Sequence, residues 1–277
     1  MSERVTITVK DHVADVRFNR PDKMNALDAA QIDAIVEAGE KLAAMGDIRA
    51  IVLSGEGKAF CAGLDMASFA ASAASASEES RDGEKSPLAN TLTERTFGNA
   101  NKYQHIVLLW RRLKAPVIAA IHGPCIGGGL QFASAADIRV VAPDAKMSIM
   151  EMRWGLIPDM GSFTTWRSFV RDDVLRELTY TNRIFTGEEG KELGFVTHLS
   201  DDPRAKAMEI ATEIAGKHPQ AVQLAKELIN KLPDMDEDEI LMMESVGQDK
   251  VARTPNQIEA VMAFMQKRAA NFTDQAA

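Results

Sequence analysis

The stretch "CIGGGLQFASAADIRV" (Cys125–Val140) joins a short apolar run to an alanine-rich helical pattern through three consecutive glycines. Because glycine has no side chain, another backbone or a ligand can approach this part of the chain closely. The start of a helix also presents free backbone N–H groups at the positive end of the helix dipole, which suits an anion or a developing oxyanion. A tight strand-to-helix turn with close packing would need the same glycines, so this stretch alone leaves both interpretations open.

A second stretch, "KAFCAGLDM" (Lys58–Met66), adds a partner for the glycines. It follows an apolar run predicted as a buried strand, Arg49–Gly55, and it places Gly63 in a polar turn. Two loops at strand ends, each with a free N–H group, can form a two-donor hole for a carbonyl oxygen. Taken by itself, the stretch is also an ordinary strand-to-loop turn.

A third stretch, "MSIMEMRWGLIPDMGS" (Met147–Ser162), carries two carboxyl groups. Glu151 lies among methionines and a tryptophan, and apolar surroundings raise the pKa of a carboxyl group so that it can act as an acid or base near neutral pH. The alternative is a surface glutamate at a strand edge. Asp159 precedes a predicted helix start, so its alternative role is that of a helix N-cap.

The whole chain alternates strand and helix patterns and then becomes helical. Alternating units of this kind predict an α/β fold, with a core over residues 1–200 and a C-terminal helical region over 201–277. The stretch Ser68–Asn90 is small, polar and poor in large apolar residues, which predicts a loop or partly ordered helix. Capping patterns start helices after Asp28, at Thr186 with Glu189, and at Thr254 with Pro255. The other predicted strands are Arg4–Lys10, Val13–Asn19, Pro116–Gly123, Ile138–Ala142 and Lys146–Met150, and the other predicted helices are Thr96–Leu113, Arg204–Lys217 and Gln220–Leu232.

Composition limits the classes of function. The chain has 277 residues, a net charge of -8 and no dense run of lysine and arginine, which argues against nucleic-acid binding. Its two cysteines, Cys61 and Cys125, are too few for a disulfide framework and suit a reducing compartment. The N-terminus lacks the pattern of a signal or transit peptide, and no apolar run reaches the roughly 18 residues of a membrane span. We therefore expect a cytoplasmic protein that acts away from membranes.

Several common catalytic signatures are missing from the sequence. There is no P-loop, nucleophile elbow or H-E-x-x-H pattern, and the five histidines lack ligand spacing, so we expect no metal. The glycine run also fails the dinucleotide-binding fingerprint, because the third glycine position is Phe132.

Taken together, the three stretches resemble the crotonase (enoyl-CoA hydratase/isomerase) superfamily. The resemblance implies a spiral of ββα repeats followed by a C-terminal helical region that builds trimers, often paired into hexamers. It also implies an acyl-CoA thioester as substrate, so that coenzyme A is part of the substrate and no separate cofactor is needed. The matching segments occur in the family's order and cover nearly the whole chain: Asn19–Leu27, "AFCAGLDM", "HGPCIGGGLQFASAADIRV", "MEMRWGLIPDMGS", "TGEEGKELGFVTHL" and "FMQKRAANF".

The resemblance also assigns roles to individual residues. The backbone N–H groups of Leu64 and Gly128 map onto the two donors that hold the thioester oxygen and stabilise an enolate. The last helix, often that of a neighbouring subunit, contributes coenzyme A contacts, which map onto Phe264 and Lys267; a solvated helix charge is the alternative for Lys267. The other coenzyme A contacts map onto Lys23, Met24, Ala26, Ala62, Asp65 and Met66.

One position departs from the family's hydratase pattern. Hydratases of the family use two glutamates, and these map onto Gln131 and Glu151. An amide at 131 can hold a water molecule but cannot take its proton, and losing general-base help typically costs ~10²–10⁴ in rate. Isomerases of the family can work with one carboxylate, the one that maps onto Glu151. The dienoyl-CoA isomerases carry Glu and Asp at the positions of Glu151 and Asp159, and an Asp in place of Gln131.

These considerations favour an acyl-CoA lyase or isomerase in which Glu151 shuttles a proton and two N–H groups hold the enolate. The alternatives are an enoyl-CoA hydratase that uses Glu151 with Asp159, and a paralogue that binds acyl-CoA without turning it over. Another thioester reaction also stays open, because one oxyanion hole can serve several chemistries.

Overall fold

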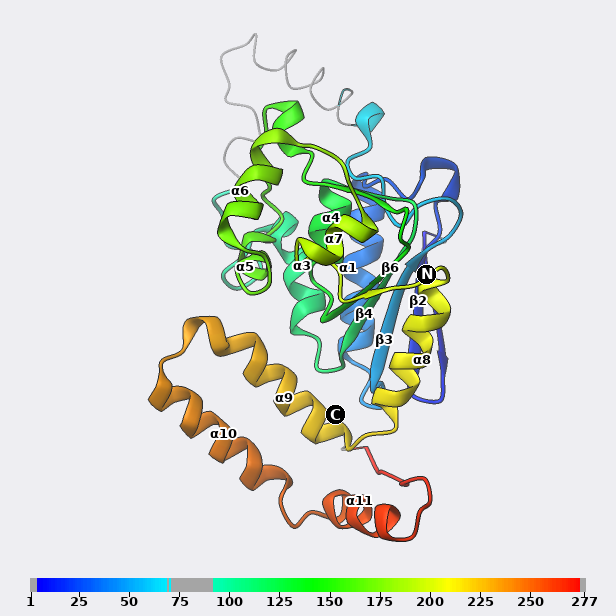
Figure 1. The fold of residues 1–277 in the computed structure, drawn as a ribbon, viewed down its shortest axis with the longest axis vertical. Helices are drawn as coiled ribbons and strands as arrows, with labels where there is room; N and C mark the ends of the chain where they lie inside the picture. The colour runs from blue at the N-terminus through cyan, green and yellow to red at the C-terminus, as the bar shows by residue number, and fades with distance from the viewer. Residues whose placement is uncertain (1–3, 69, 71–91, 275–277) are drawn as a thin grey trace.

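The structure is a computed structural model that describes residues 4–68, 70 and 92–274. Nearly all of the predicted loop Ser68–Asn90 therefore lies outside the described residues. The chain forms an α/β body, drawn in the upper part of Figure 1, and a set of C-terminal helices below it.

A six-stranded sheet forms the centre of the body, and its strands lie in the order β1-β2-β3-β4-β6-β9 (Figure 1). The first two strands, both of which were predicted, pair antiparallel, and the turn between them holds Asp11 and His12 at φ 50° and 64°. All other neighbours in this sheet are parallel. Its strands are β1 (Val5–Lys10), β2 (Val13–Phe18), β3 (Ala50–Gly55), β4 (Val117–Ile121), β6 (Ile138–Val141) and β9 (His198–Leu199).

A smaller sheet contains the strand that leads into the glycine run. The predicted strand Pro116–Gly123 ends early, because the chain turns at Gly123, where φ is 56° and an added Cβ would lie 2.0 Å from the Lys58 carbonyl oxygen. The sequence prediction missed the short strand β5 that follows this turn. It pairs parallel with β7, which pairs antiparallel with β8. These strands are β5 (Pro124–Ile126), β7 (Lys146–Ser148) and β8 (Phe185–Thr186).

Two of the longer helices of the body begin at side-chain caps. Asp28 accepts a hydrogen bond from the backbone N–H of Gln31 and starts α1 (Ala29–Ala43), as predicted. The predicted helix Thr96–Leu113 starts too early, because Asn101 and Gln104 form a capping box that begins α3 (Lys102–Arg112). Local side-chain hydrogen bonds, which satisfy free N–H groups of the first turn, therefore set both helix starts.

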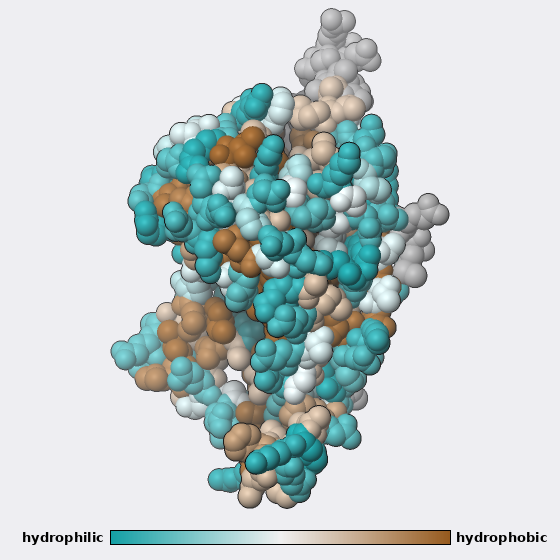
Figure 2. Space-filling view, turned by 45° about the vertical axis from the view of Figure 1, so that its right-hand side comes forward, coloured by the Kyte–Doolittle hydropathy of each residue, from teal (hydrophilic) through white to brown (hydrophobic). Residues whose placement is uncertain are grey.

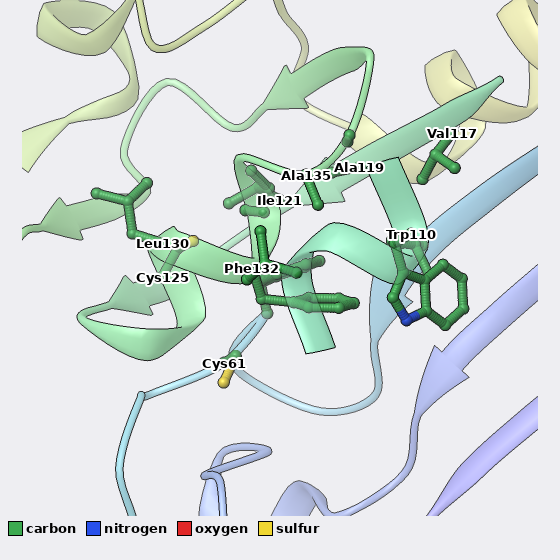
Figure 3. Packing of buried hydrophobic residues seen from close by; sticks show 14 of the residues in the cluster. Cys61, Trp110, Val117, Ala119, Ile121, Cys125, Leu130, Phe132 and Ala135 are labelled. Carbon is green, nitrogen blue, oxygen red and sulfur yellow. The ribbon is translucent and has the colours of Figure 1, made fainter. Parts of the chain in front are cut away.

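Shorter helices carry the chain around the glycine run and beyond it. The predicted capping box of Thr186 and Glu189 is confirmed at the start of α7. Phe132 of α4 lies in the core, with its ring centroid 5.7 Å from that of Trp110 of α3 (Figure 3). The short helices are α4 (Gly128–Ala133), the 3-10 helix η4 (Glu151–Trp154), α5 (Phe163–Trp166), α6 (Asp172–Thr181) and α7 (Gly187–Glu192).

The helix α8 (Pro203–Ala215) covers one face of the main sheet. Its alanines Ala207, Ala211 and Ala215 recur at a spacing of four residues, so they lie on one side of the helix and are buried. They pack against small and β-branched side chains of the central strands, Val13, Ala50, Val52, Ile118, Ala120 and Val140.

Three further helices extend below the body (Figure 1). They are α9 (Pro219–Lys231), α10 (Glu237–Val251) and α11 (Pro255–Met265). The Lys226 ammonium joins α9 to the body through an ion pair of 2.8 Å with Asp137. The cap at Thr254 is confirmed, whereas α10 was not predicted although Asp236 opens it with a capping box. The division at residue 200, the spiral of repeats and the trimer stay predictions.

Candidate active site

Each glycine of the run contacts a different neighbour. An added Cβ on Gly129 would lie 2.4 Å from the Cys61 carbonyl oxygen, and one on Gly127 would lie 3.3 Å from Oε1 of Glu151. On Gly128 it would lie 3.0 Å from a methyl carbon of Leu27. Close packing therefore explains Gly129 by itself, while Gly127 also lies next to the carboxyl group of Glu151.

Backbone hydrogen bonds join the glycine run to the Lys58–Met66 stretch. Cys61 donates to Pro124 at 3.1 Å, and Ile126 donates back to Cys61 at 3.0 Å. Gly63 adopts φ 85°, and a Cβ added there would lie 2.5 Å from the Ile126 carbonyl oxygen and 3.7 Å from the Gly128 nitrogen. The two loops predicted to meet therefore lie in direct contact.

Two backbone N–H groups where these loops meet have no acceptor among the described residues. The backbone N–H of Leu27 donates to the Gly63 carbonyl at 2.7 Å, and the Leu27 carbonyl accepts from the N–H of Asp65 at 3.0 Å. This pairing passes over Leu64, so its N–H takes no part in these backbone hydrogen bonds. In the described part of the chain, neither Leu64 nor Gly128 donates its backbone N–H to a protein acceptor. These are the two groups that the resemblance assigns to an oxyanion hole.

Glu151 is buried at the start of η4, so the alternative of a surface glutamate is wrong. Its Oε1 accepts a hydrogen bond of 2.6 Å from Nε2 of Gln131. Its Oε2 is also buried and has no hydrogen-bond partner among the described residues. One oxygen of the carboxyl group is thus held by protein, and the other is left for a ligand.

The Gln131 side chain is bonded at both ends of its amide. Its Oε1 accepts from the backbone N–H of Met160 at 3.0 Å and from the Ser162 hydroxyl at 2.7 Å. Protein groups occupy the amide oxygen, and Glu151 takes one of the two amide N–H donors, so the holding of a water molecule by Gln131 stays a prediction. The contacts to Met160 and Ser162 were not predicted, and no sequence spacing signals them.

Burial raises the pKa of Glu151, the hydrogen bond from Gln131 acts in the opposite direction, and the negative charge of Asp159 adds to the rise. Asp159 itself is solvent-exposed, but the protein around its carboxyl group raises its pKa by desolvation. The alternative of Asp159 as a helix cap is wrong, because α5 begins at Phe163 and Ser162 occupies the cap position. Two carboxyl groups with raised pKa values therefore lie near each other.

In the segment Asn19–Leu27, the residues predicted to contact coenzyme A lie beside the Lys58–Met66 loop, which contains Leu64. Lys23 is exposed at the end of a 3-10 helix (Pro21–Lys23), Met24 follows it exposed in the left-handed conformation, and Ala26 is buried. The backbone N–H of Ala62 donates to the Met24 carbonyl at 2.9 Å, which ties the two segments together.

Asp65 is engaged within the chain. Its carboxylate forms an ion pair of 2.9 Å with Arg20 and accepts hydrogen bonds from the backbone N–H groups of Ala67 and Ser68. The guanidinium of Arg20 also contacts Asp28, at 3.1 Å. Arg20, which the sequence analysis did not single out, therefore links the Asn19–Leu27 segment to the loop that carries Asp65. Asp65 thus shapes the loop, while Met66 is exposed beside it.

Phe264 and Lys267 lie elsewhere. They sit at the end of α11, at the bottom of Figure 1, whereas α4 lies in the upper body. Phe264 is 86% exposed. A single chain therefore does not bring them to the other predicted residues, and their contribution to a neighbouring subunit's site stays a prediction.

The described residues contain no group of three or more potential ligands that could hold a metal ion. Within the same part of the chain, no helix is both long and apolar enough to cross a membrane.

Comparison with known proteins gives consistent results. A family model described as enoyl-CoA hydratase/isomerase matches residues 13–276. A mitochondrial Delta(3,5)-Delta(2,4)-dienoyl-CoA isomerase of Mus musculus is 32% identical over 96% of this chain and 80% of its own length. The enoyl-CoA hydratase EchA19 of Mycobacterium tuberculosis is 32% identical over 95% of this chain and 94% of its own length.

A solved structure extends the similarity to the fold. The crystal structure of an enoyl-CoA hydratase from Bacillus anthracis superposes with a TM-score of 0.85 at 27% identity, and the match covers 98% of this chain and 100% of that one. The chain therefore belongs to the enoyl-CoA hydratase/isomerase family, as an enzyme with the crotonase-like α/β fold.

Proposed function

We propose that the protein is an acyl-CoA isomerase that moves a double bond through a thioester enolate, with Glu151 as the proton shuttle. The observation that carries the proposal is the arrangement of Glu151 and Gln131. One buried carboxyl oxygen is held by an amide and the other is free, and the place of a second glutamate is taken by a group that cannot accept a proton.

The free N–H groups of Leu64 and Gly128 supply the electrostatic part of the reaction. A thioester oxygen placed between them gains negative charge as the enolate forms, and hydrogen bonds strengthen with that charge. Loss of one such donor typically raises the barrier by about 3–4 kcal/mol.

The proton follows a path set by Glu151. Its free Oε2 takes a proton from the α-carbon, and the electron pair of that bond moves into the enolate. A 3-enoyl thioester then receives the proton at the γ-carbon, and the double bond ends in conjugation with the carbonyl. In a 3,5-dienoyl thioester the proton must return at the ε-carbon, farther from the thioester. We assign that step to Asp159, whose pKa is raised by desolvation: its protonated carboxyl donates a proton to the ε-carbon, the proton on Glu151 then passes to solvent, and Asp159 takes up another, which resets both groups.

The relatives support an isomerase without deciding it. Dienoyl-CoA isomerases named from Mus musculus and Homo sapiens are 32% and 34% identical to this chain. The chain carries Glu151 and Asp159 at the positions where that subgroup, by resemblance, has its Glu and Asp.

The coenzyme A part of the substrate is assigned to the loops beside Leu64 and to a neighbouring subunit. Met66 and Met24 present exposed apolar surface there, and Lys23 offers a positive charge. A lysine near a phosphate is favourable by electrostatics. Under this proposal, Phe264 and Lys267 of another copy complete the site, and no separate cofactor takes part.

A hydratase is the second candidate. The observation that favours it is the proximity of Asp159 to Glu151, since the negative charge of Asp159 contributes to the raised pKa of Glu151. Glu151 with Asp159 would then handle a water molecule, and EchA19 bears the name of that activity.

Turnover of 3-enoyl-CoA, 3,5-dienoyl-CoA and crotonyl-CoA separates the candidates. We expect isomerisation of the first two substrates to exceed hydration of the third. Glu151→Gln should lower isomerisation by about 10²–10⁴-fold, because the shuttle loses its basic oxygen. Asp159→Asn should affect the dienoyl substrate more than the 3-enoyl substrate. Hydration of crotonyl-CoA as the fastest reaction, or isomerisation that Glu151→Gln lowers by less than about tenfold, would overturn the proposal.

A further inference from the structure

We infer that Gln131 is a positioning residue, which clamps Oε1 of Glu151 and thereby presents Oε2 to the substrate. The inference rests on the proposed function for its role in turnover. It goes beyond that function, because it assigns a task to the residue that departs from the hydratase pattern.

The orientation of the Gln131 amide follows from its partners. The backbone N–H of Met160 can only donate a hydrogen bond, so the amide atom 3.0 Å from it is the oxygen. The NH₂ group must then face Glu151, where the distance is 2.6 Å. The opposite orientation would set two donors against each other at Met160 and two acceptors against each other at Glu151.

The clamp joins three segments of the chain. Gln131 lies in the first turn of α4, Glu151 begins η4, and Met160 with Ser162 follows Asp159 directly. Gln131 is 1% exposed, so water does not compete for these hydrogen bonds. The Gln131 side chain therefore fixes the position of Glu151 relative to the backbone that follows Asp159.

A neutral donor suits this task better than a second carboxylate. The hydrogen bond from Gln131 lowers the pKa of Glu151 and opposes the effect of burial, which keeps more of the base ionised. A glutamate at 131 could donate to Glu151 only while protonated, and two ionised carboxylates at this separation would repel each other. The amide holds the shuttle at every pH.

The test compares the full-length protein with Gln131→Met, which keeps the volume of the side chain and removes its hydrogen bonds. Carbon NMR of the Glu151 carboxyl, assigned by its loss in Glu151→Gln, follows the titration without any need for turnover. We expect the Glu151 pKa to rise in Gln131→Met. With an isomerisable substrate, kcat should fall about 10–100-fold, as misplacement of a catalytic group does, while KM changes by less than about threefold.

Two further variants keep the test decisive. Ser134→Ala removes a buried hydroxyl of the adjoining α4 turn that bonds to the Leu130 carbonyl and the Trp166 indole, and it should leave the Glu151 titration unchanged. Gln131→Glu keeps an acceptor for Met160 and Ser162, so it serves if the methionine variant does not fold. In that variant the two carboxyls share a proton and titrate as a pair, so the Glu151 signal should no longer follow the titration seen in the parent protein.

The outcomes separate the inference from the proposed function. An unchanged Glu151 titration in both Gln131 variants, or an equal shift in Ser134→Ala, overturns the clamp. A shifted titration in a protein that isomerises none of the substrates overturns the proposed function and leaves the clamp standing. A loss of kcat with no change in the pH profile would overturn the assigned role in turnover.

Discussion

The carboxyl group of Glu151 lies inside the protein, and only one of its oxygens has a hydrogen-bond partner among the residues that the structure describes. A buried polar atom without a partner costs the fold about 1–3 kcal/mol. A group with a raised folded-state pKa supports the fold while it is protonated and loses that contribution as the pH rises through the folded pKa. The reactive oxygen is therefore expected to lower stability at neutral pH.

Glu151→Gln should stabilise the protein at neutral and alkaline pH although it removes the basic group that takes the proton. The neutral amide removes the buried charge and can still accept the Gln131 hydrogen bond, so we expect a gain of about 1 kcal/mol, or about 2–4 °C in Tm. Thermal unfolding at several pH values checks this, and the gain should shrink as the pH falls and Glu151 becomes protonated.

The exposed Glu244 on α10 offers a matched control, because Glu244→Gln changes the same groups in solvent. The Tm of Glu244→Gln should equal the Tm of the parent protein at every pH. A Glu151→Gln variant that is less stable than the parent at alkaline pH would show that the carboxylate has a stabilising partner.

At the scale of elements, the contact between the glycine run and the Lys58–Met66 loop holds the two proposed N–H donors of the active site in place. Each loop follows a strand, and their backbones bond to each other through Cys61. No side chain fits between Gly129 and the Cys61 carbonyl. The distance between the Leu64 and Gly128 donors thus depends on backbone packing.

Gly129→Ala should push these loops apart. Because the added methyl would meet a backbone oxygen at 2.4 Å, we expect overpacking to cost about 1–3 kcal/mol of unfolding free energy and to reduce activity more than stability alone explains. Denaturant unfolding and steady-state kinetics measure the two effects.

Gly247→Ala provides the comparison within α10, where an added Cβ meets nothing within 4 Å. There the better helix propensity of alanine should stabilise by about 0.5–1 kcal/mol. Equal and small effects of both substitutions would contradict the close approach at Gly129.

At the scale of the whole molecule, the C-terminal helices carry exposed apolar side chains. Apolar surface gathers over the lower part of the molecule in Figure 2, the level at which Figure 1 places α9–α11. Surfaces of this kind mark interaction sites, and the resemblance predicts a trimer or a dimer of trimers. The exposed residues on these helices include Ile229, Leu241, Met242, Val246, Ile258, Met262 and Met265.

Met242→Asp should shift the protein from oligomer toward monomer, because burying a new charge in an apolar contact is unfavourable. Light scattering after size-exclusion chromatography measures the mass. The KM for acyl-CoA should rise together with dissociation if Phe264 and Lys267 serve a neighbouring site. Gln248→Glu, an exposed polar position on the same helix, is the control. A parent protein that is monomeric at assay concentration would contradict the prediction.

The sequence by itself determined the features that depend on neighbouring residues. The β1–β2 hairpin and the caps at Asp28, Thr186 and Thr254 were predictable because each depends on a few adjacent side chains and turns. The apolar setting of Glu151 was predictable in the same way. The start of α3 and the strand β5 were not, since a weak capping signal and a turn against a distant carbonyl set them.

Only the tertiary structure decided which distant groups meet. Gln131 reaches Glu151 across 20 positions of sequence and Ser162 across 31, and the sequence contained neither pairing. The direction of a buried side chain depends on how the segments around it pack, which no local pattern records. For this reason the sequence could show that an amide replaces a carboxylate, whereas the fold showed that the amide holds the carboxylate that remains.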